Sequence, residues 1–306
     1  MLITTTLHAT APEGGTAVAL GFFDGIHRGY TRVIAKAVEQ ARERGLVPCV
    51  FTFSAPAGGS PKPVGELIQT EAVKRYILEQ MGVEQMFCPA FEAFRGLSPE
   101  EFVRDILAGS FHARVVTCGE NFRFGKNAAG TVETLRRLGE QYGIAVEVLP
   151  LERENGEIIS STMIRAALRD GDIEQANRLL GHPFTLIAPV VHGRELGRQW
   201  NYPTANQQFP PEQIIPKNGV YGTIAVCDGV RYVGSTNVGT KPTVGGRTVL
   251  SETFLVGYEG DLYGKELTVE FYHFLRGEKK FPSTEDLRAA IEENTRQAVA
   301  LCEKYR

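Results

Sequence analysis

The chain has 306 residues, of which 42% are hydrophobic and 23% are charged, and its formal net charge is −3. This length accommodates two domains with ordinary cores, whereas the near balance of charge gives no electrostatic basis for binding nucleic acid. No stretch reaches the roughly 18 consecutive apolar residues that a membrane span needs. The first residues lack the basic and apolar segments of a secretion signal, and the five cysteines are far apart. We therefore expect a cytoplasmic protein without nucleic-acid or membrane partners.

The first half of the chain alternates strand-forming and helix-forming segments. The predicted strands are 16–23, 46–53, 113–117 and 144–149. Apolar residues recur at helical spacing from Val33 to Ala41, and Gly45 is placed to end that helix. Thr70 is expected to cap the next helix, and Ser98 to Glu101 form a capping box. This alternation predicts a mostly parallel sheet with right-handed crossovers.

After Pro183 the pattern changes to repeated short runs of strand-forming residues separated by turns. The predicted strands are 186–191, 220–226, 232–238, 249–256 and 267–274. They indicate an antiparallel barrel or sandwich, and Ser283 is expected to cap a final helix. We place the domain boundary between residues 183 and 184.

A candidate nucleotide site joins the first predicted strand to the first helix. Its candidate residues are Gly21, Phe22, Asp24, Gly25 and His27. In an open parallel sheet, ligands bind at the carboxyl ends of the strands, where helix N-termini attract anions. A histidine there can donate a hydrogen bond to a phosphate oxygen. The alternative is a plain turn followed by a surface histidine.

Two further segments could contribute to the same end of the sheet. Ser160, Ser161 and Thr162 open a helix after the last strand of the first half, and Arg165 follows on its first turn. Asn121 follows another predicted strand, in a loop that could contact a base or a flavin. The alternative for the helix start is an ordinary N-cap with a solvated arginine.

The second half holds a different candidate site, built from a glycine-containing turn and three polar side chains. Gly193, Gly197 and Arg198 lie in the turn, and glycines let a backbone approach phosphate oxygens closely. Thr204 and Asn206 could hold Mg²⁺, and Glu252 could take a proton from an attacking hydroxyl. These residues suit phosphoryl transfer from ATP to an alcohol. Alternatively, Thr204 and Asn206 are turn residues and Glu252 faces solvent on a strand.

Seven segments carry a resemblance to a known family. They are GFFDGIH, GENFRFG, ISSTMIR, PTAN, NVGTKPT, ETFL and GDLYGKEL. In this order the chain resembles the bacterial bifunctional riboflavin kinase/FMN adenylyltransferases (FAD synthetases) over essentially its full length. Each segment alone is a weak signal, but their joint occurrence across both halves is highly specific.

The resemblance implies a Rossmann-like nucleotidylyltransferase domain over 1–183 that transfers AMP from ATP to FMN, giving FAD. It also implies a small antiparallel β-barrel kinase domain over 184–306, with a C-terminal helix, that phosphorylates riboflavin with ATP. By position, His27, Asn121 and Arg165 would serve the ATP/FMN site. Thr204 and Asn206 would hold Mg²⁺ and the phosphates of ATP, and Glu252 would be the general base of the kinase.

The chain departs from the family pattern at two places in the first half. Tyr30 stands where the pattern has a second histidine, and residues 54–57 read Ser-Ala-Pro-Ala where the family usually has Asp-Pro-His-Pro. Tyrosine can donate a hydrogen bond but does not become a cation as imidazole does. Two alternatives therefore stay open: a riboflavin kinase with an impaired adenylyltransferase, or a non-catalytic regulator that binds flavin or nucleotide.

Overall fold

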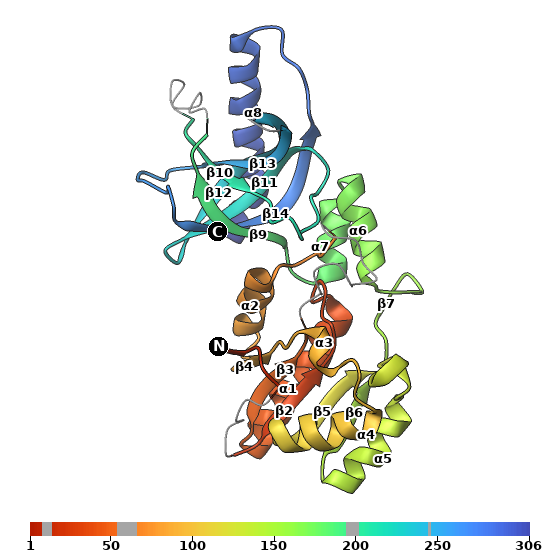
Figure 1. Ribbon diagram of the computed structural model, residues 1–306. Helices are drawn as coiled ribbons and strands as arrows, with labels where there is room; N and C mark the ends of the chain where they lie inside the picture. The colour runs from red at the N-terminus through yellow and green to blue at the C-terminus, as the bar shows by residue number, and fades with distance from the viewer. Residues whose placement is uncertain (8–13, 54–65, 194–201, 244–245) are drawn as a thin grey trace. The chain divides into compact units, whose positions relative to one another are not determined.

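The computed structural model describes residues 1–7, 14–53, 66–193, 202–243 and 246–306. The chain forms two compact units (Figure 1). The first consists of Met1–Pro63 and Lys74–Ile159, and the second consists of Val64–Val73 and Ser160–Arg306.

The first unit is built on a six-stranded sheet in which all neighbouring strands are parallel. The strands are β1 (Leu2–Thr4), β2 (Thr16–Leu20), β3 (Val47–Phe51), β4 (Gln85–Phe87), β5 (Ala113–Gly119) and β6 (Ala145–Leu149), in the order β1-β4-β3-β2-β5-β6. From β2 the chain adds β3 and β4 on one side, and then returns to add β5 on the other side of β2. The strand order therefore reverses between β2 and β5, which is where ligands bind in open α/β sheets.

Helices connect these strands, as the alternating pattern predicts. They are α1 (Arg28–Arg44), α2 (Glu71–Gln80), α3 (Phe91–Phe94), α4 (Pro99–Glu101) with the π-helical segment η1 (Phe102–Ser110), the 3₁₀ turn η2 (Lys126–Ala128) and α5 (Val132–Tyr142). The predicted caps are confirmed. Gly45 ends α1 with φ 65°, Ser98 and Glu101 form a reciprocal capping box, and the Thr70 hydroxyl accepts from the Val73 amide. A small hairpin follows, made of β7 (Arg153–Glu154) and β8 (Glu157–Ile158).

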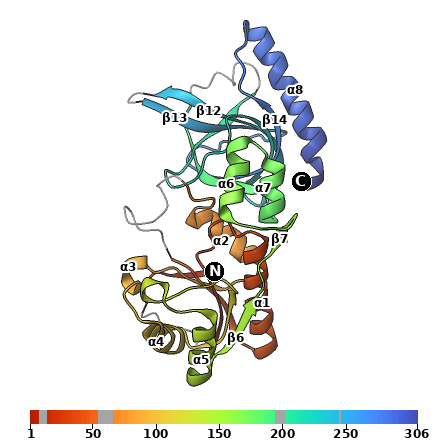
Figure 2. The ribbon, with the colours of Figure 1, turned by 90° about the vertical axis from the view of Figure 1, so that its right-hand side faces the viewer.

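The second unit contains a closed barrel of six antiparallel strands. Of the two architectures that the sequence predicts for this half, the barrel is therefore confirmed and the sandwich is wrong. The strands are β9 (Phe184–Val191), β10 (Thr204–Gln208), β11 (Gly219–Cys227), β12 (Val230–Thr243), β13 (Gly246–Leu255) and β14 (Glu266–Gly277), in the order β10-β13-β12-β11-β14-β9. Helix α8 (Thr284–Cys302), capped by Ser283 as predicted, packs on β11, β12 and β14 (Figure 2) and leads into η4 (Glu303–Tyr305).

Two helices ahead of the barrel, α6 (Ser161–Asp170) and α7 (Ile173–Leu180), belong to the second compact unit. The Asn177 side chain ties α7 to the barrel, because it donates to the Phe271 carbonyl at 2.7 Å and accepts from the Phe184 amide at 2.8 Å. The compact units thus divide ahead of α6, while the boundary of the functional domains at 183/184 stays a prediction.

The interior of the barrel holds a chain of buried hydroxyl groups. Thr236 lies 2.7 Å from Thr223 and 2.9 Å from Thr253, measured between their Oγ1 atoms. All three side chains are fully buried, as is Ser251. Because side chains alternate along a strand, Glu252 between Ser251 and Thr253 points to the outer face of β13.

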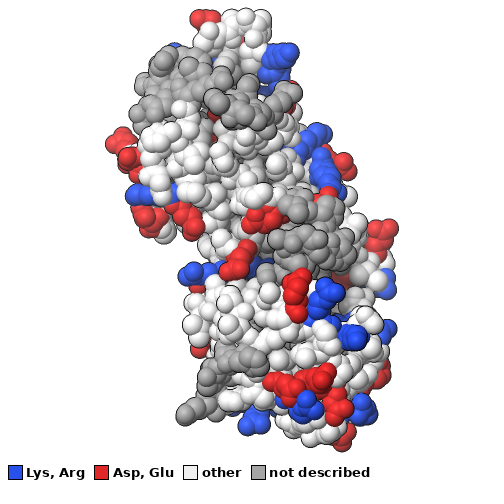
Figure 3. Space-filling model, viewed as in Figure 1, with Lys and Arg blue, Asp and Glu red and all other residues white. Residues whose placement is uncertain are grey.

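None of the helices in the described parts of the chain is long and apolar enough to cross a membrane. Figure 3 shows acidic and basic side chains interspersed on the face in view. This distribution agrees with the small net charge.

Candidate functional site

In the first unit, the predicted site residues follow two adjacent strands. Gly21 to His27 come directly after β2, and Asn121 comes directly after β5, its neighbour in the sheet. A Cβ atom on Gly119, the last residue of β5, would lie 3.3 Å from Oδ1 of Asn121, so the Asn121 side chain turns back over the end of its own strand. The fold thus brings these residues to the point where the strand order reverses.

His27 is held tightly at the start of α1, where it is the N-cap residue. Only 6% of it is exposed, so the alternative of a surface histidine is wrong. Its ring stacks on Tyr30, with centroids 4.0 Å apart and an angle of 19° between the planes. A Cβ on Gly29 would come within 3.3 Å of the imidazole Nδ1 and Cε1 atoms, so the backbone of α1 closes around the ring.

The loop that leads to His27 has an unusual backbone. Phe23 has φ 52°, a left-handed conformation that is rare for a bulky residue, and Gly25 has φ 69°. Phe23 and Asp24 are buried. A Cβ on Gly21 would lie 2.8 Å from the Phe23 ring, so glycine is required there. Such backbone strain is typical of functional sites and persists only when the surroundings fix it.

Ion pairs attach the β7–β8 hairpin region to the first turns of α1. Arg28 binds Glu154 at 2.5 Å and Glu152 at 3.2 Å, and Arg32 binds Glu152 at 2.6 Å. The hydrogen bond from Arg32 lowers the pKa of the Glu152 carboxyl below its usual value, and the hydrogen bond with Glu154 raises the pKa of Arg28. These pairs help to fix the helix start that carries His27.

The second predicted anion site lies in the other compact unit, at the start of α6. Ser160 is the N-cap residue, and its hydroxyl accepts from the Met163 amide. Arg165 is 6% exposed, and its Nε donates to the Glu66 carbonyl at 2.6 Å. The alternative of a solvated arginine is therefore wrong. That Ser160, Ser161, Thr162 and Arg165 act together with His27 stays a prediction.

In the second unit, the strand register places the predicted kinase residues in one row. Asn206 on β10 faces Glu252 on β13, and Asn237 on β12 faces Glu252 from the other side. Nδ2 of Asn237 donates to Oε2 of Glu252 at 3.2 Å. Thr204 and Asn206 belong to a strand, so the alternative of turn residues is wrong. In the sequence, Asn237 stands out only as the first residue of the NVGTKPT segment, because the register that gives it a role depends on pairing between distant strands.

The start of the predicted glycine turn packs on the Asn206 side chain. A Cβ on Gly193 would lie 2.5 Å from Nδ2 and 3.0 Å from Oδ1 of Asn206, so only glycine fits there without displacement. Asn206 is 5% exposed, and its Nδ2 donates to the Thr204 carbonyl at 3.2 Å. Gly197 and Arg198, the other predicted residues of this turn, lie outside the described residues.

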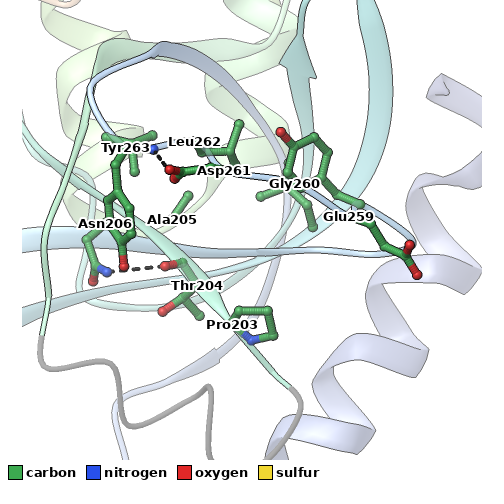
Figure 4. Close-up of a pocket in the computed structure, with 12 residues that line it drawn as sticks. Pro203, Thr204, Ala205, Asn206, Glu259, Gly260, Asp261, Leu262 and Tyr263 are labelled. Atoms are coloured by element: carbon green, nitrogen blue, oxygen red, sulfur yellow. Dashed lines mark hydrogen bonds between the residues drawn. The ribbon is translucent and has the colours of Figure 1, made fainter.

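A pocket of about 290 Å³ lies beside this row. It is lined by Val190, residues 203–206, Leu255 and residues 258–263. In Figure 4, Thr204, Asn206 and Tyr263 border the same cavity, while the Glu259 carboxylate points away from it. The Tyr263 ring stacks on His192 at 3.9 Å, and the Asp261 side chain accepts from the Tyr263 amide, so Asp261 serves a local turn. Asn206 thus borders the pocket and also faces Glu252.

The oxygen donors beside the pocket suit a magnesium ion that arrives with a nucleotide. Among the described residues there is no cluster of three or more His, Cys, Asp or Glu that could hold a metal by itself. Thr204 and Asn206 offer a hydroxyl and an amide oxygen from positions two residues apart, and therefore on the same face of β10. Mg²⁺ prefers such hard oxygen ligands, keeps several waters, and is commonly shared with substrate phosphates.

Comparisons with known proteins agree with both halves of this description. The family model for FAD synthetase matches residues 9–163, and the family model for riboflavin kinase matches residues 180–302. A bifunctional riboflavin kinase/FMN adenylyltransferase of Pseudomonas fluorescens is 35% identical, with 98% of each chain aligned. The chain belongs to the bifunctional riboflavin kinase/FMN adenylyltransferase family.

Other members of this family are similar over nearly the same length. The Bacillus subtilis protein is 34% identical over 96% of this chain and 97% of its own. A solved structure named a macrolide-efflux protein, from Streptococcus pneumoniae, is 27% identical with a TM-score of 0.83, covering 97% of this chain and 98% of that one. The fold described above is therefore shared along the whole chain.

Proposed function

We propose that this protein is a bifunctional enzyme of flavin cofactor biosynthesis, which phosphorylates riboflavin to FMN and adenylylates FMN to FAD. ATP is the donor in both steps. One observation carries the proposal. The FAD synthetase model and the riboflavin kinase model match the two halves of one chain, and each half holds a candidate site suited to the matching chemistry. Residues 1–183 carry the adenylyltransferase and residues 184–306 carry the kinase, a division supported by matches over 9–163 and 180–302.

In the kinase step, the 5′-hydroxyl oxygen of riboflavin attacks the γ-phosphorus of ATP, and the bond from that phosphorus to the β-phosphate oxygen breaks. Glu252 accepts the hydroxyl proton, and its carboxylate is oriented by the hydrogen bond from Asn237. ATP occupies the pocket bordered by Thr204 and Asn206, where the Gly193 turn approaches its phosphates. Thr204 and Asn206 would hold Mg²⁺, which offsets the negative charge of the phosphates when bound.

In the adenylyltransferase step, a phosphate oxygen of FMN attacks the α-phosphorus of ATP, and pyrophosphate leaves. His27 donates a hydrogen bond to the reacting phosphate, and the backbone amides at the start of α1 face the same charge. The Gly21–Gly25 loop and Asn121 contact the nucleotide at the edge of the sheet. Ser160, Ser161, Thr162 and Arg165 supply a second anion-binding helix start. The comparisons give no support to an impaired adenylyltransferase or to a non-catalytic regulator.

The first test is a product assay. The protein is incubated with riboflavin, ATP and MgCl₂, and the flavins are separated by chromatography. FAD is the expected product, and chelation of magnesium with EDTA is expected to stop both steps. Accumulation of FMN alone would instead support the impaired adenylyltransferase, and unchanged riboflavin would support the regulator.

The second test separates the two sites by mutation. Glu252→Gln is expected to lower riboflavin phosphorylation by about 10²–10⁴-fold, with little change in ATP binding and with FMN adenylylation intact. His27→Ala is expected to lower FMN adenylylation and leave the kinase intact. Glu266→Gln is the matched control for the glutamate, because Glu266 is an exposed residue of the same barrel and does not line the pocket. Normal phosphorylation by Glu252→Gln would remove Glu252 from the mechanism.

A further inference from the structure

A buried lysine lies against the loop that leads to His27. Lys74 on α2 is only 8% exposed. Its Nζ donates to the Phe22 carbonyl at 3.1 Å, lies 3.5 Å from Oγ1 of Thr52, and is 5.3 Å from the centroid of the Phe22 ring. Burying an ammonium group costs free energy unless hydrogen-bond acceptors surround it. The placement of Lys74 therefore calls for a role beyond filling space.

The Phe22 carbonyl accepts a second hydrogen bond from the neighbouring strand. Oγ1 of Thr52, the residue after β3, donates to it at 2.8 Å, and Thr52 is fully buried. The Thr52 backbone amide in turn donates to the Phe87 carbonyl at the end of β4. One carbonyl oxygen is thus held from two sides, by a group fixed on the sheet and by a cation on α2. We call Thr52 and Lys74 the carbonyl clamp.

The clamp acts at the one place in the loop where the backbone needs external support. The residue after Phe22 is Phe23, whose left-handed φ of 52° is disfavoured for an aromatic side chain. Fixing the Phe22 carbonyl sets the orientation of the peptide unit between these two residues. From there the chain runs four residues to His27 and the first backbone amides of α1. A rotation of this peptide would move both.

We propose that Thr52 and Lys74 are positioning residues for adenylyl transfer, which hold the Gly21–His27 loop and the start of α1 in the reactive geometry. The proposal rests on the assignment of FMN adenylylation to this loop. The clamp atoms donate to a backbone carbonyl and act on the reaction through it. Small displacements of reacting groups are costly, since an error of about 1 Å can lower the rate about 10²-fold.

The experiment compares four variants of the full-length chain, Lys74→Met, Lys74→Arg, Thr52→Val and Thr52→Ser. Methionine fills much of the lysine volume without the charge or the donor, and replacing a buried charge by an apolar side chain is often compatible with folding. FMN adenylylation is measured from added FMN and ATP. The KM for ATP in adenylylation reports whether the first unit keeps its folded site, and riboflavin phosphorylation by the same preparation reports the second unit. Lys36→Met, which removes a partly exposed lysine paired with Glu39, is the control for loss of charge.

Lys74→Met is expected to lower kcat of adenylylation by about 10–100-fold, with KM for ATP changed less than about threefold and with normal phosphorylation. Lys74→Arg is expected to recover most of the rate, because guanidinium also donates. Thr52→Val is expected to be slower than Thr52→Ser. A change in KM alone, or a normal kcat in both Lys74→Met and Thr52→Val, would overturn the clamp.

Two further outcomes are also informative. If Lys74→Met loses both activities, the Thr52 pair decides: slow adenylylation with normal phosphorylation in Thr52→Val supports the clamp, and equal rates in Val and Ser overturn it. His27→Ala distinguishes a failure of the clamp from a failure of the proposal that adenylylation takes place at this loop. Normal adenylylation in His27→Ala would remove the reaction from this loop, whereas a slow His27→Ala beside normal kcat values in both Lys74→Met and Thr52→Val would remove only the clamp.

Discussion

Asn237 donates a hydrogen bond from Nδ2 to Oε2 of Glu252 at 3.2 Å, and the two residues face each other across the β12–β13 pair. Glu252 faces Asn206 on its other side, and Asn206 borders the pocket. The carboxylate therefore stands between an amide that orients it and a residue that borders the pocket in which we propose that ATP binds. A general base needs such fixed geometry as much as a suitable charge.

Asn237→Ala is expected to lower kcat of riboflavin phosphorylation about tenfold or more, because it removes a hydrogen bond to a charged acceptor. KM for ATP should stay near that of the parent chain, since Asn237 does not line the pocket. The double variant with Glu252→Gln provides the control in steady-state kinetics. If Asn237 acts through Glu252, the double variant is no slower than Glu252→Gln alone. If each substitution instead lowers kcat by its own factor and the two factors multiply in the double variant, this role of Asn237 is contradicted.

Gly193→Ala is expected to impair the kinase, because the new Cβ would lie 2.5 Å from Nδ2 of Asn206 and force either the turn or that side chain to move. We expect weaker ATP binding together with a lower kcat, measured by isothermal titration with ATP and by FMN formation. Gly277→Ala is the matched control in the same barrel, since nothing lies within 4 Å of its Cβ position. Parent-like behaviour of Gly193→Ala would show that the turn does not depend on this contact.

The sequence predicts well those features that depend on neighbours along the chain. The caps at Gly45, Ser98 and Ser283 are visible because each uses a residue type that the helix end itself requires. The period of apolar residues likewise reveals most strands of both units. In contrast, β1 and β4 have only three residues each, too few for a period to be recognised, and the closure of the barrel depends on pairing between strands far apart.

In the candidate sites too, residues recognised from local motifs can be predicted, whereas contacts between distant segments cannot. Thr204, Asn206 and Glu252 are found from residue type and motif, and strand register then brings Asn206 and Glu252 face to face. Lys74 contacts the Phe22 carbonyl across 52 residues of chain, and its helix shows no local sign of that contact. The stacking of Tyr30 on His27 is also invisible in the sequence, where Tyr30 is noticed only as a departure from the family pattern.

Tyr30 is expected to support adenylylation through its ring. Tyr30→Leu removes the stacking on His27 and the edge contact with Phe23. Aromatic pairs of this kind contribute about 0.5–1.5 kcal/mol, so FAD formation from FMN should fall about three- to tenfold. Tyr30→Phe keeps the ring and should stay within about twofold of the parent, and phosphorylation of riboflavin is the internal control. A rise in FAD formation in Tyr30→His would instead support an impaired parent module.

Thr236→Val tests the hydroxyl chain inside the barrel. Valine has nearly the same shape, but it leaves the buried hydroxyls of Thr223 and Thr253 without their shared partner. The free energy of unfolding should fall by about 1–3 kcal/mol, measured by urea denaturation. Thr268→Val is the control, because Thr268 lies between the buried Leu267 and Val269 on β14 and points outward. Equal stability of the two variants would show that the hydroxyl chain contributes little to the stability of the barrel.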